Sequence, residues 1–357
     1  MKKSRLILFL GGALVGLGLA AGWAALRQRP GGTGALAVVY LSPAEAPELW
    51  LSSPDGREKR QLTRSGGQVY DAAAFADGSR IVYSVGNALG GLDVWLVERS
   101  GGGAKRLIDC GADRCQEAAP APDGGQIAYS RRSAAENPSG SPAAGRIWLY
   151  SIVDGSTHAL VPDALVNGSQ PTWSPDGRQL AFYDSRAGAI HVLRLADGRE
   201  RHFQTDLNAP GSWSPDGKQL AFAASQQALE GPQGRLFVGD VESGQARSVA
   251  AEAGGLDFGP PDWGKGGWLA VGAIRLEQGP GREIWLVRAD GSEQRALTED
   301  GRYSNGALSW SPDGTQLLSQ RIGVTASGSR PEVLIWSTAR NQAVVLAENA
   351  ALPVWLP

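Results

Sequence analysis

The chain has 357 residues and a formal net charge of −2. This balance excludes bulk electrostatic attraction to nucleic acid or to an anionic membrane surface. The three His and two Cys leave little material for metal or nucleophile chemistry, so we expect no metal site, no cofactor and no assignable catalytic residue. The 49 Gly and 21 Pro are typical of short strands joined by tight turns.

The N-terminal segment has the pattern of a membrane anchor. A positively charged stretch, residues 1–5, precedes an uncharged run over residues 6–26. At about 1.5 Å per residue, a helix over this run spans roughly 30 Å, the thickness of a bilayer core. The flanking positive charge is slightly heavier on the N-terminal side, which predicts a cytoplasmic N-terminus.

We therefore predict a single-pass cell-membrane protein. Residues 1–5 are its cytoplasmic end, residues 6–26 a signal-anchor transmembrane helix, residues 27–34 a linker and residues 35–357 an extracytoplasmic domain. The alternative is that the helix is cleaved as a signal peptide and the domain is secreted.

One phrase, Trp-Ser-Pro-Asp-Gly, recurs at residues 173–177, 213–217 and 310–314. Pro presets the first turn position, Asp caps the turn and Gly takes the positive φ, so each copy predicts a β-hairpin. Weaker copies start at Ala76, Pro122 and Trp263.

A second turn follows each copy, with an apolar strand before it and a short strand after it. The turns begin at Ser100, Asp154, Asp197, Ser243, Asp290 and Arg340. Each unit therefore holds four strands and recurs every 40 to 53 residues, the period of a β-propeller blade.

The two ends of the domain supply one more unit. Residues 35–41, 49–51 and 60–63 match the second to fourth strands of a blade, and residues 353–357 match the first strand. We predict an all-β, seven-bladed propeller over residues 35–357, closed by pairing of its N- and C-terminal strands, which removes the open edges of the array.

The repeat Trp-Ser-Pro-Asp-Gly-x-x-Leu-Ala-Phe resembles the WD40-like propeller repeat of TolB and of the propeller domains of prolyl-oligopeptidase-type peptidases. The resemblance covers residues 35–357 and implies fold rather than function. The sequence departs from TolB in having room for seven blades instead of six and in lacking a separate N-terminal α/β domain.

The Trp residues of the repeat are interpreted as packing between blades, with an aromatic recognition platform as the alternative. His158, His191 and His202 show no ligand spacing with Cys or carboxylates, which argues against zinc. The sequence has no Gly-x-Ser-x-Gly elbow, which argues against a serine hydrolase.

The loops opposite the Asp-Gly turns are long and varied, and binding usually occurs on such loops. Charged residues cluster where the second strands meet these loops. The candidate ligand-binding residues are Arg131, Arg132, Asp184, Arg186, Arg275 and Arg321. They predict a partly cationic rim for an acidic group of a partner; the alternative is that they are solvated charges at the loop bases.

We predict a non-enzymatic scaffold that binds another protein, a peptide or a cell-envelope component, and no nucleic acid, through this loop face. The alternative is a hydrolase or lyase with its site at the channel mouth. Its candidate residues are Asp71, Asp184, Asp206, Asp257 and Tyr303. A third possibility is a sensor or assembly subunit whose helix contacts partner membrane proteins.

Cys110 and Cys115 lie in one connection between two blades. Outside the cytoplasm, this pair is expected to form a disulfide that contributes about 2–3 kcal/mol at most. Thiol titration of the denatured, unreduced chain is therefore expected to find no free thiol, and titration after reduction to find two. Two free thiols in the unreduced, exported protein would contradict the disulfide.

Overall fold

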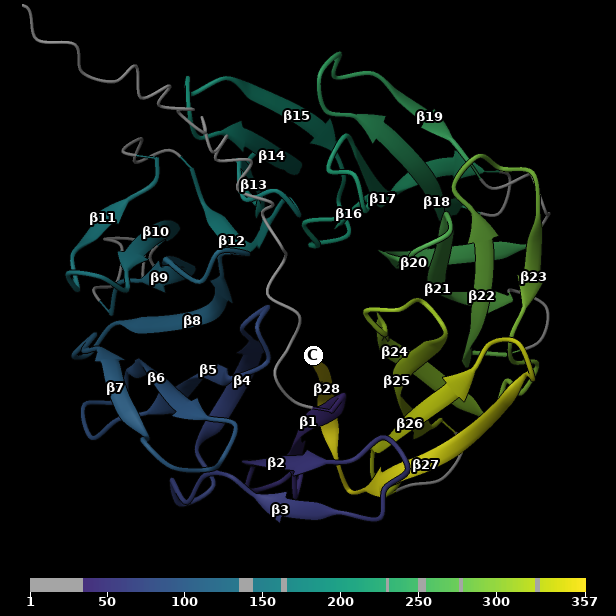
Figure 1. Ribbon diagram of the computed structural model, residues 1–357. Helices are drawn as coiled ribbons and strands as arrows, with labels where there is room; N and C mark the ends of the chain where they lie inside the picture. Colours follow the sequence, from purple (N-terminus) through teal and green to yellow (C-terminus); the bar gives the residue numbers. More distant parts are fainter. Residues whose placement is uncertain are drawn as a thin grey trace, which may run out of the picture.

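The computed structural model describes residues 35–134, 144–161, 166–228, 231–249, 255–275, 279–324 and 328–357. The regular structure in these residues is β-strand, arranged as a ring of sheets (Figure 1). The predicted anchor at residues 6–26 lies outside the described residues. Among the residues that are described, no helix has the length and apolar character needed to cross a membrane.

Five sheets have four antiparallel strands each. The sheet that closes the ring has the order β28 (Ala351–Leu356), β1 (Ala37–Ser42), β2 (Glu48–Ser52), β3 (Lys59–Gln61). The other four sheets follow the chain: β12 (Gly168–Trp173), β13 (Gln179–Asp184), β14 (Ala189–Arg194) and β15 (Glu200–Gln204); β16 (Ser212–Trp213), β17 (Gln219–Ala228), β18 (Gly231–Asp240) and β19 (Ala246–Ser248); β20 (Leu256–Trp263), β21 (Trp268–Arg275), β22 (Arg282–Arg288) and β23 (Gln294–Ala296); β24 (Tyr303–Trp310), β25 (Gln316–Gly323), β26 (Glu332–Ser337) and β27 (Gln342–Glu348).

The sixth sheet has eight strands. They are β4 (Val69–Ala74), β5 (Arg80–Gly86), β6 (Leu92–Glu98), β7 (Lys105–Ile108), β8 (Arg114–Pro120), β9 (Gln126–Arg132), β10 (Gly145–Ser151) and β11 (Thr157–Ala159). Strands β4–β7 and β8–β11 each form a four-stranded antiparallel unit, and one parallel pair, Leu92 with Arg114, joins the two units.

The prediction of a seven-bladed propeller is therefore confirmed only as to the all-β propeller fold: five four-stranded sheets are separate, and the other eight strands form one sheet. The reason lies in the connection between β7 and β8. The predicted disulfide Cys110–Cys115 is present there, and the Leu92 amide donates a hydrogen bond to the Asp113 carbonyl at 3.0 Å. The connection is thus held against the end of β6, where the two units meet.

Closure of the ring by the two ends of the domain is confirmed. Strand β28 pairs antiparallel with β1, with Ala37 opposite Leu356 and Val38 opposite Trp355. Figure 1 shows these two strands side by side, although they come from opposite ends of the described chain. Leu356 and Val38 are fully buried, so the seam is part of the core.

The repeated phrase forms the predicted hairpin turn. In the copy at Ser174, the hydroxyl donates to Asp176 Oδ1 at 2.6 Å and accepts the Gln179 amide at 2.9 Å. Gly177 has a φ of +71°, and its amide donates to the Ser174 carbonyl. The copies at Ser214 and Ser311 repeat these contacts, which explains why the phrase needs its Ser and Asp as well as its Gly.

The Trp residues of the innermost strands join neighbouring blades, as predicted. Four indole N–H groups donate to backbone carbonyls of the preceding blade. The pairs are Trp173 to Ala119 (2.9 Å), Trp213 to Thr172 (3.3 Å), Trp310 to Asp262 (3.2 Å) and Trp355 to Ser309 (2.9 Å). The Nε1 atom of Trp263 has no hydrogen-bond partner among the described residues.

Replacement of Trp173 by Phe is expected to lower the free energy of unfolding by about 1 kcal/mol more than replacement of Trp263 by Phe. Both changes remove an indole, but only the first removes a hydrogen bond and leaves the Ala119 carbonyl without its donor. Urea unfolding of the two variants measures the difference. Equal losses would show that the indole hydrogen bond does not stabilise the ring.

Candidate functional site

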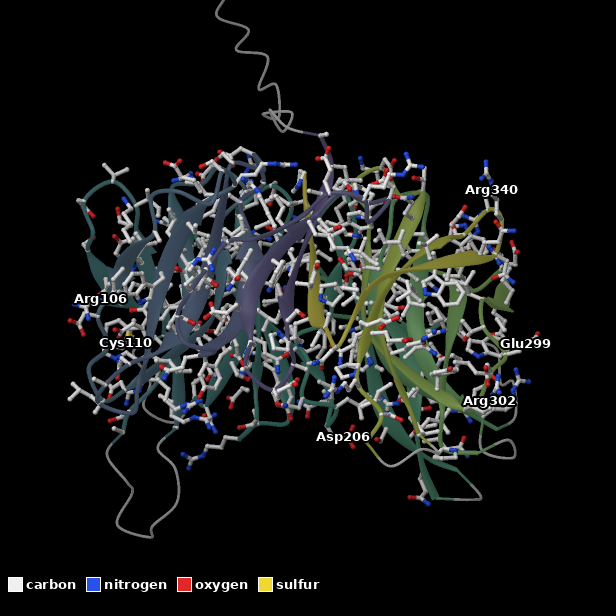
Figure 2. The ribbon with its side chains drawn as sticks, turned by 90° about the horizontal axis from the view of Figure 1, so that it is seen from below. Arg106, Cys110, Asp206, Glu299, Arg302 and Arg340 are labelled. Carbon is white, nitrogen blue, oxygen red and sulfur yellow. A yellow bond between two sulfur atoms is a disulfide. The ribbon has the colours of Figure 1, made fainter. Side chains whose placement is uncertain are left out.

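The two edges of the ring differ as the sequence predicts. Figure 2 shows Asp206 and Arg302, which belong to connections between successive blades, at one edge, and Arg340, from a hairpin turn, at the opposite edge. The predicted rim residues on strands stand near the loop ends of those strands: Arg131 and Arg132 on β9, Asp184 on β13, Arg275 on β21 and Arg321 on β25.

Three of the rim arginines are paired within their own blades or with the connection that leads into them. Each guanidinium contacts a carboxylate and lies over an aromatic ring. The partners are Asp113 (2.8 Å) and Trp148 for Arg131, Glu283 (3.0 Å) and Trp285 for Arg275, and Glu332 (2.7 Å) and Tyr303 for Arg321. Their charge is therefore largely compensated in place, and ligand binding through them stays a prediction.

The remaining rim residues divide into one buried and two exposed side chains. Asp184 is only 3% exposed, and its Oδ1 accepts the backbone amides of Asn167 and Arg186 at 3.1 and 2.9 Å. The side chains of Arg132 and Arg186 are exposed. Asp184 thus holds the end of its strand, and Arg132 and Arg186 are the predicted cations that face solvent.

The other residues named for the enzymatic alternative also stabilise the fold. Asp206 accepts the Ser225 amide at 2.9 Å, and Asp257 accepts the Gly234 amide at 2.6 Å. Tyr303 lies under the Arg321 guanidinium, 4.4 Å from it. These contacts join strands or neighbouring blades and do not gather the three residues into one site.

Asp71 takes part in a polar ladder along the innermost strands. Its Oδ2 accepts the Glu117 amide at 2.7 Å, and Glu117 Oε2 accepts the Gln170 amide at 2.7 Å. Glu117 and Gln170 have φ values of 57° and 54°, within bulges where β8 and β12 lose register with their partners. Burial raises the pKa of Asp71, and the nearby charge of Glu117 adds to the rise.

A second carboxylate, Asp262, connects three blades elsewhere in the ring. Its Oδ2 accepts the Trp310 amide at 2.8 Å, and its Oδ1 accepts the Ser212 hydroxyl at 3.2 Å. Burial raises the pKa of this carboxyl above its ordinary value of 3.8. Neither the ladder nor the contacts of Asp262 were predicted from the sequence. Bulges in the innermost strands change the number of residues between an inner-strand side chain and the next turn, so its position cannot be counted from the repeat.

A pocket of about 420 Å³ lies in the wall that Asp262 helps to build. Its lining comes mainly from the innermost strands β16, β20 and β24, and it includes Ser212, Asp262, Arg282 and Asn305. Arg282 is the first residue of β22, directly after a loop of the loop-rich face. The pocket is therefore formed by successive blades and is close to the predicted binding face.

The Arg282 side chain passes two glycines on its way to this pocket. A Cβ atom at Gly272 would lie 3.6 Å from Arg282 Cδ, and one at Gly259 would lie 3.3 Å from its Nη1. The side chain therefore runs from the third strand of the blade past the second strand to the bulge of the innermost strand. Its guanidinium makes no ion pair with any acid that the structure describes.

Asn305 adds a hydrogen-bond acceptor to the same pocket. Its Nδ2 donates to the Arg282 carbonyl at 2.7 Å, which turns Oδ1 the other way. Although the residue is only 4% exposed, Oδ1 has no partner among the described residues. A buried polar atom without a partner is destabilising, so this oxygen indicates a place for a donor group.

A larger hollow of about 590 Å³ separates β15 from β17 and β18. Its lining includes three aromatic side chains, Phe203, Phe222 and Phe237. None of the buried polar atoms left without a partner in the described chain lines this hollow. The pocket with Arg282 and Asn305 therefore has the stronger chemical signature of a binding site.

Two of the three histidines lie together with a carboxylate, although their sequence spacing did not predict it. His191 on β14 lies directly opposite His202 on β15, and their ring centroids are 4.2 Å apart. Glu200 lies beside both. The two histidines are 11 residues apart in the sequence, and the hairpin between β14 and β15 brings them together. The sequence feature that could have indicated this cluster is the replacement of a third-strand Trp by His191.

Comparison with known proteins supports the fold. No protein-family model matches the chain. The uncharacterized peptidase YuxL of Bacillus subtilis is 29% identical over 228 residues, which cover 59% of this chain and 30% of that protein. The chain thus spans less than a third of the curated relative that it matches.

Solved structures with the same architecture include TolB from Acinetobacter baumannii, with a TM-score of 0.53, 18% identity and coverage of 90% of this chain and 83% of TolB. A puromycin hydrolase complexed with PGG has a TM-score of 0.63 and 18% identity, and the match covers 89% of this chain and 52% of the hydrolase. A prolyl endopeptidase has a TM-score of 0.61 at 13% identity, over 86% of this chain and 47% of the enzyme. The chain has a TolB-like β-propeller fold, as its repeat predicted.

The raised pKa of Asp262 predicts a pH dependence of stability. The folded carboxyl holds its proton at pH values where the unfolded chain has released it, so stability falls as the pH rises from the unfolded pKa to the folded pKa. The Asp262→Asn variant has no titrating group at this position and does not lose stability in this way. Its free energy of unfolding, relative to that of the natural chain, is expected to increase with pH between the unfolded and the folded pKa of Asp262, as measured by urea titrations.

Asp313→Asn is the matched control. Hydrogen bonds from Ser311 and Thr315 lower the pKa of Asp313, so this carboxylate contributes stability that is lost as the pH falls. The relative stability of Asp313→Asn should therefore change with pH in the opposite direction. If the difference in free energy of unfolding between Asp262→Asn and the natural chain does not change with pH, the pKa of Asp262 is not raised by burial.

Proposed function

We propose that this chain is a membrane-tethered, extracytoplasmic β-propeller that binds the free carboxylate end of a peptide without cleaving it. In this proposal, the ring has seven blades, two of which share the eight-stranded sheet. The pocket with Arg282 and Asn305 is the binding site, and residues 6–26 hold the propeller at the outer side of the cell membrane.

The observation that supports this proposal most is that one pocket holds a cation and a hydrogen-bond acceptor, neither of which has a partner among the residues that the structure describes. A guanidinium without an acidic partner can donate two parallel hydrogen bonds to a carboxylate. Asn305 Oδ1, which is buried and has no partner in the described part of the chain, can accept the N–H of the last peptide bond. The pocket volume of about 420 Å³ is within the usual range for small ligands.

The choice of a peptide is supported by the similar proteins. The relative in Bacillus subtilis is described as a peptidase, and two structural neighbours are a prolyl endopeptidase and a hydrolase complexed with PGG. This sequence has no Gly-x-Ser-x-Gly motif, which favours capture over cleavage. The enzymatic alternative is supported by Asp71, whose raised pKa beside Glu117 would suit an acid–base pair.

The test measures binding of fluorescein-labelled Pro-Gly-Gly by fluorescence polarisation, with a free C-terminal carboxylate and with a C-terminal amide. The natural chain should bind the carboxylate form more tightly by about 10- to 100-fold. This factor corresponds to the usual contribution of hydrogen bonds to a charged group. Arg282→Ala should remove this preference, and Asn305→Ala should weaken the binding of both forms.

Arg186→Ala is the control, because Arg186 is an exposed cation of the predicted rim outside the pocket. Loss of the preference in Arg186→Ala instead of Arg282→Ala would support the rim. Cleavage of the peptide by the natural chain and not by Asp71→Asn would support the enzymatic alternative. Equal affinity for the acid and the amide would contradict carboxylate capture.

A further inference from the structure

A cluster of three potential metal ligands lies on the outer part of one blade, away from the pocket with Arg282. Other blades place Trp at the equivalent third-strand position, opposite a residue without a metal-binding side chain: Trp50 faces Gln61, Trp148 faces Ala159 and Trp285 faces Ala296. In this blade, His191 faces His202. The departure from the repeat thus introduces two imidazoles at one spot.

The distances within the cluster fit a single ion. Glu200 Oε2 lies 3.7 Å from His191 Nδ1 and 3.1 Å from His202 Nε2. Zinc binds nitrogen and oxygen ligands at about 2.0–2.1 Å, so neighbouring ligands of a tetrahedral zinc are roughly 3.3 Å apart. The donor atoms of His191, Glu200 and His202 all lie within 4.8 Å of one another, so rotation of the partly exposed Glu200 and His202 side chains can bring them to this spacing.

The surroundings orient His191 for this role. The residue is 7% exposed, and its ring stacks on Phe182 with 5.0 Å between centroids. Its Nε2 makes no hydrogen bond with any described residue and lies 3.4 Å from Asp184 Oδ2. A metal-bound imidazole usually directs its second nitrogen at a carboxylate, so Asp184 is placed to support Nδ1 coordination.

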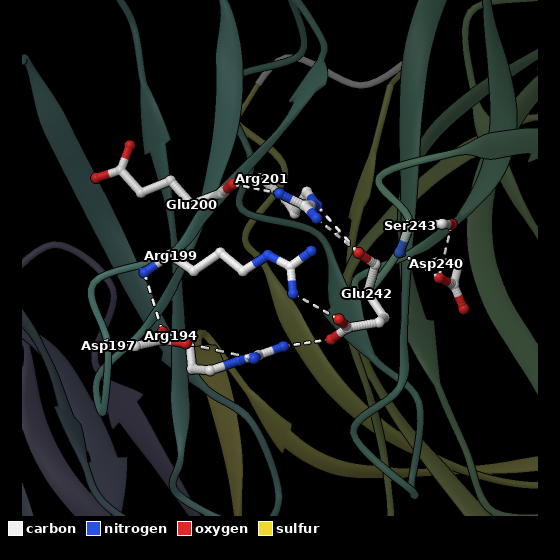
Figure 3. A network of polar contacts seen from close by, with 8 residues as sticks. All are labelled: Arg194, Asp197, Arg199, Glu200, Arg201, Asp240, Glu242 and Ser243. Atoms are coloured by element: carbon white, nitrogen blue, oxygen red, sulfur yellow. Dashed lines mark hydrogen bonds and ion pairs between the residues drawn. The ribbon is translucent and has the colours of Figure 1, made fainter.

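The neighbouring arginines contact Glu242 and form no ion pair with the Glu200 carboxylate among the described residues. Figure 3 shows Arg194, Arg199 and Arg201 directed at Glu242, while the Glu200 carboxylate points away from them. Arg194 and Arg199 form ion pairs with the Glu242 carboxylate, and Arg201 donates to its backbone carbonyl at 2.8 Å. Glu200 is consequently left to the two histidines.

We propose that His191, Glu200 and His202 bind a zinc ion, with Asp184 orienting His191. Two imidazoles and one carboxylate match the borderline character of zinc. Glu200 and His202 are partly exposed, at 34% and 48% of their side chains, which leaves a fourth position for solvent. The ion would bridge β14 and β15 at the outer part of the blade.

The test uses the full chain, stripped of metal with a chelator. Titration with Zn²⁺ in competition with a fluorescent chelator should find one bound equivalent, and Co²⁺ should give the visible absorption of a tetrahedral site. His202→Ala should weaken zinc binding at least 100-fold. Asp184→Asn, which keeps an acceptor oxygen, should weaken it by about 10- to 100-fold.

His158→Ala is the matched control, since His158 is the third histidine of the chain and lies on β11. It should bind zinc like the natural chain. About half of the His202 side chain is exposed, so its replacement should not disturb folding, and circular dichroism would verify this. The absence of a stoichiometric zinc site, or unchanged zinc affinity in His202→Ala, would overturn the proposal.

Discussion

The structure depends on the pairing of β28 with β1. A curved row of four-stranded sheets leaves two open edges, and unpaired strand edges invite association with other chains. The last strand, β28, forms backbone hydrogen bonds with the otherwise open edge of β1. The Trp355 indole also donates a hydrogen bond to the Ser309 carbonyl of the preceding blade. Because the C-terminal strand completes the blade of the N-terminal strands, the ring closes without any further element.

The inner wall of the ring is built from bulged strands. Where a bulge interrupts the ladder, backbone amides turn away from their own sheet and need other acceptors. Asp71 and Glu117 accept such amides from the next blade, and Asp262 accepts the amide of Trp310. These carboxylates stabilise the contacts between blades, and the same irregular backbone at Gly259 admits the Arg282 side chain to the pocket.

The two proposed sites arise in different ways. The pocket with Arg282 and Asn305 requires residues from successive blades, so it exists only in the assembled ring. The histidine cluster is local to one hairpin, with β14 and β15 supplying its three ligands. The rim arginines illustrate a third case. Arg131, Arg275 and Arg321 all lie near strand ends, and each has an acidic partner in its own blade or in the connection that leads into it.

The sequence alone determined the repeat, the hairpin turns, the disulfide and the pairing of the two ends, because these follow from short-range turn chemistry and a regular period. Which charged residues have a partner among the described residues became clear from the folded arrangement of the strands. Pairing of Arg131 with Asp113 spans 18 residues, and Arg282 reaches its pocket past glycines on two other strands. The joining of two units into one eight-stranded sheet was also decided there. Such contacts depend on strand register and on bulges, which shift every later residue relative to its turn and have no local sequence signature.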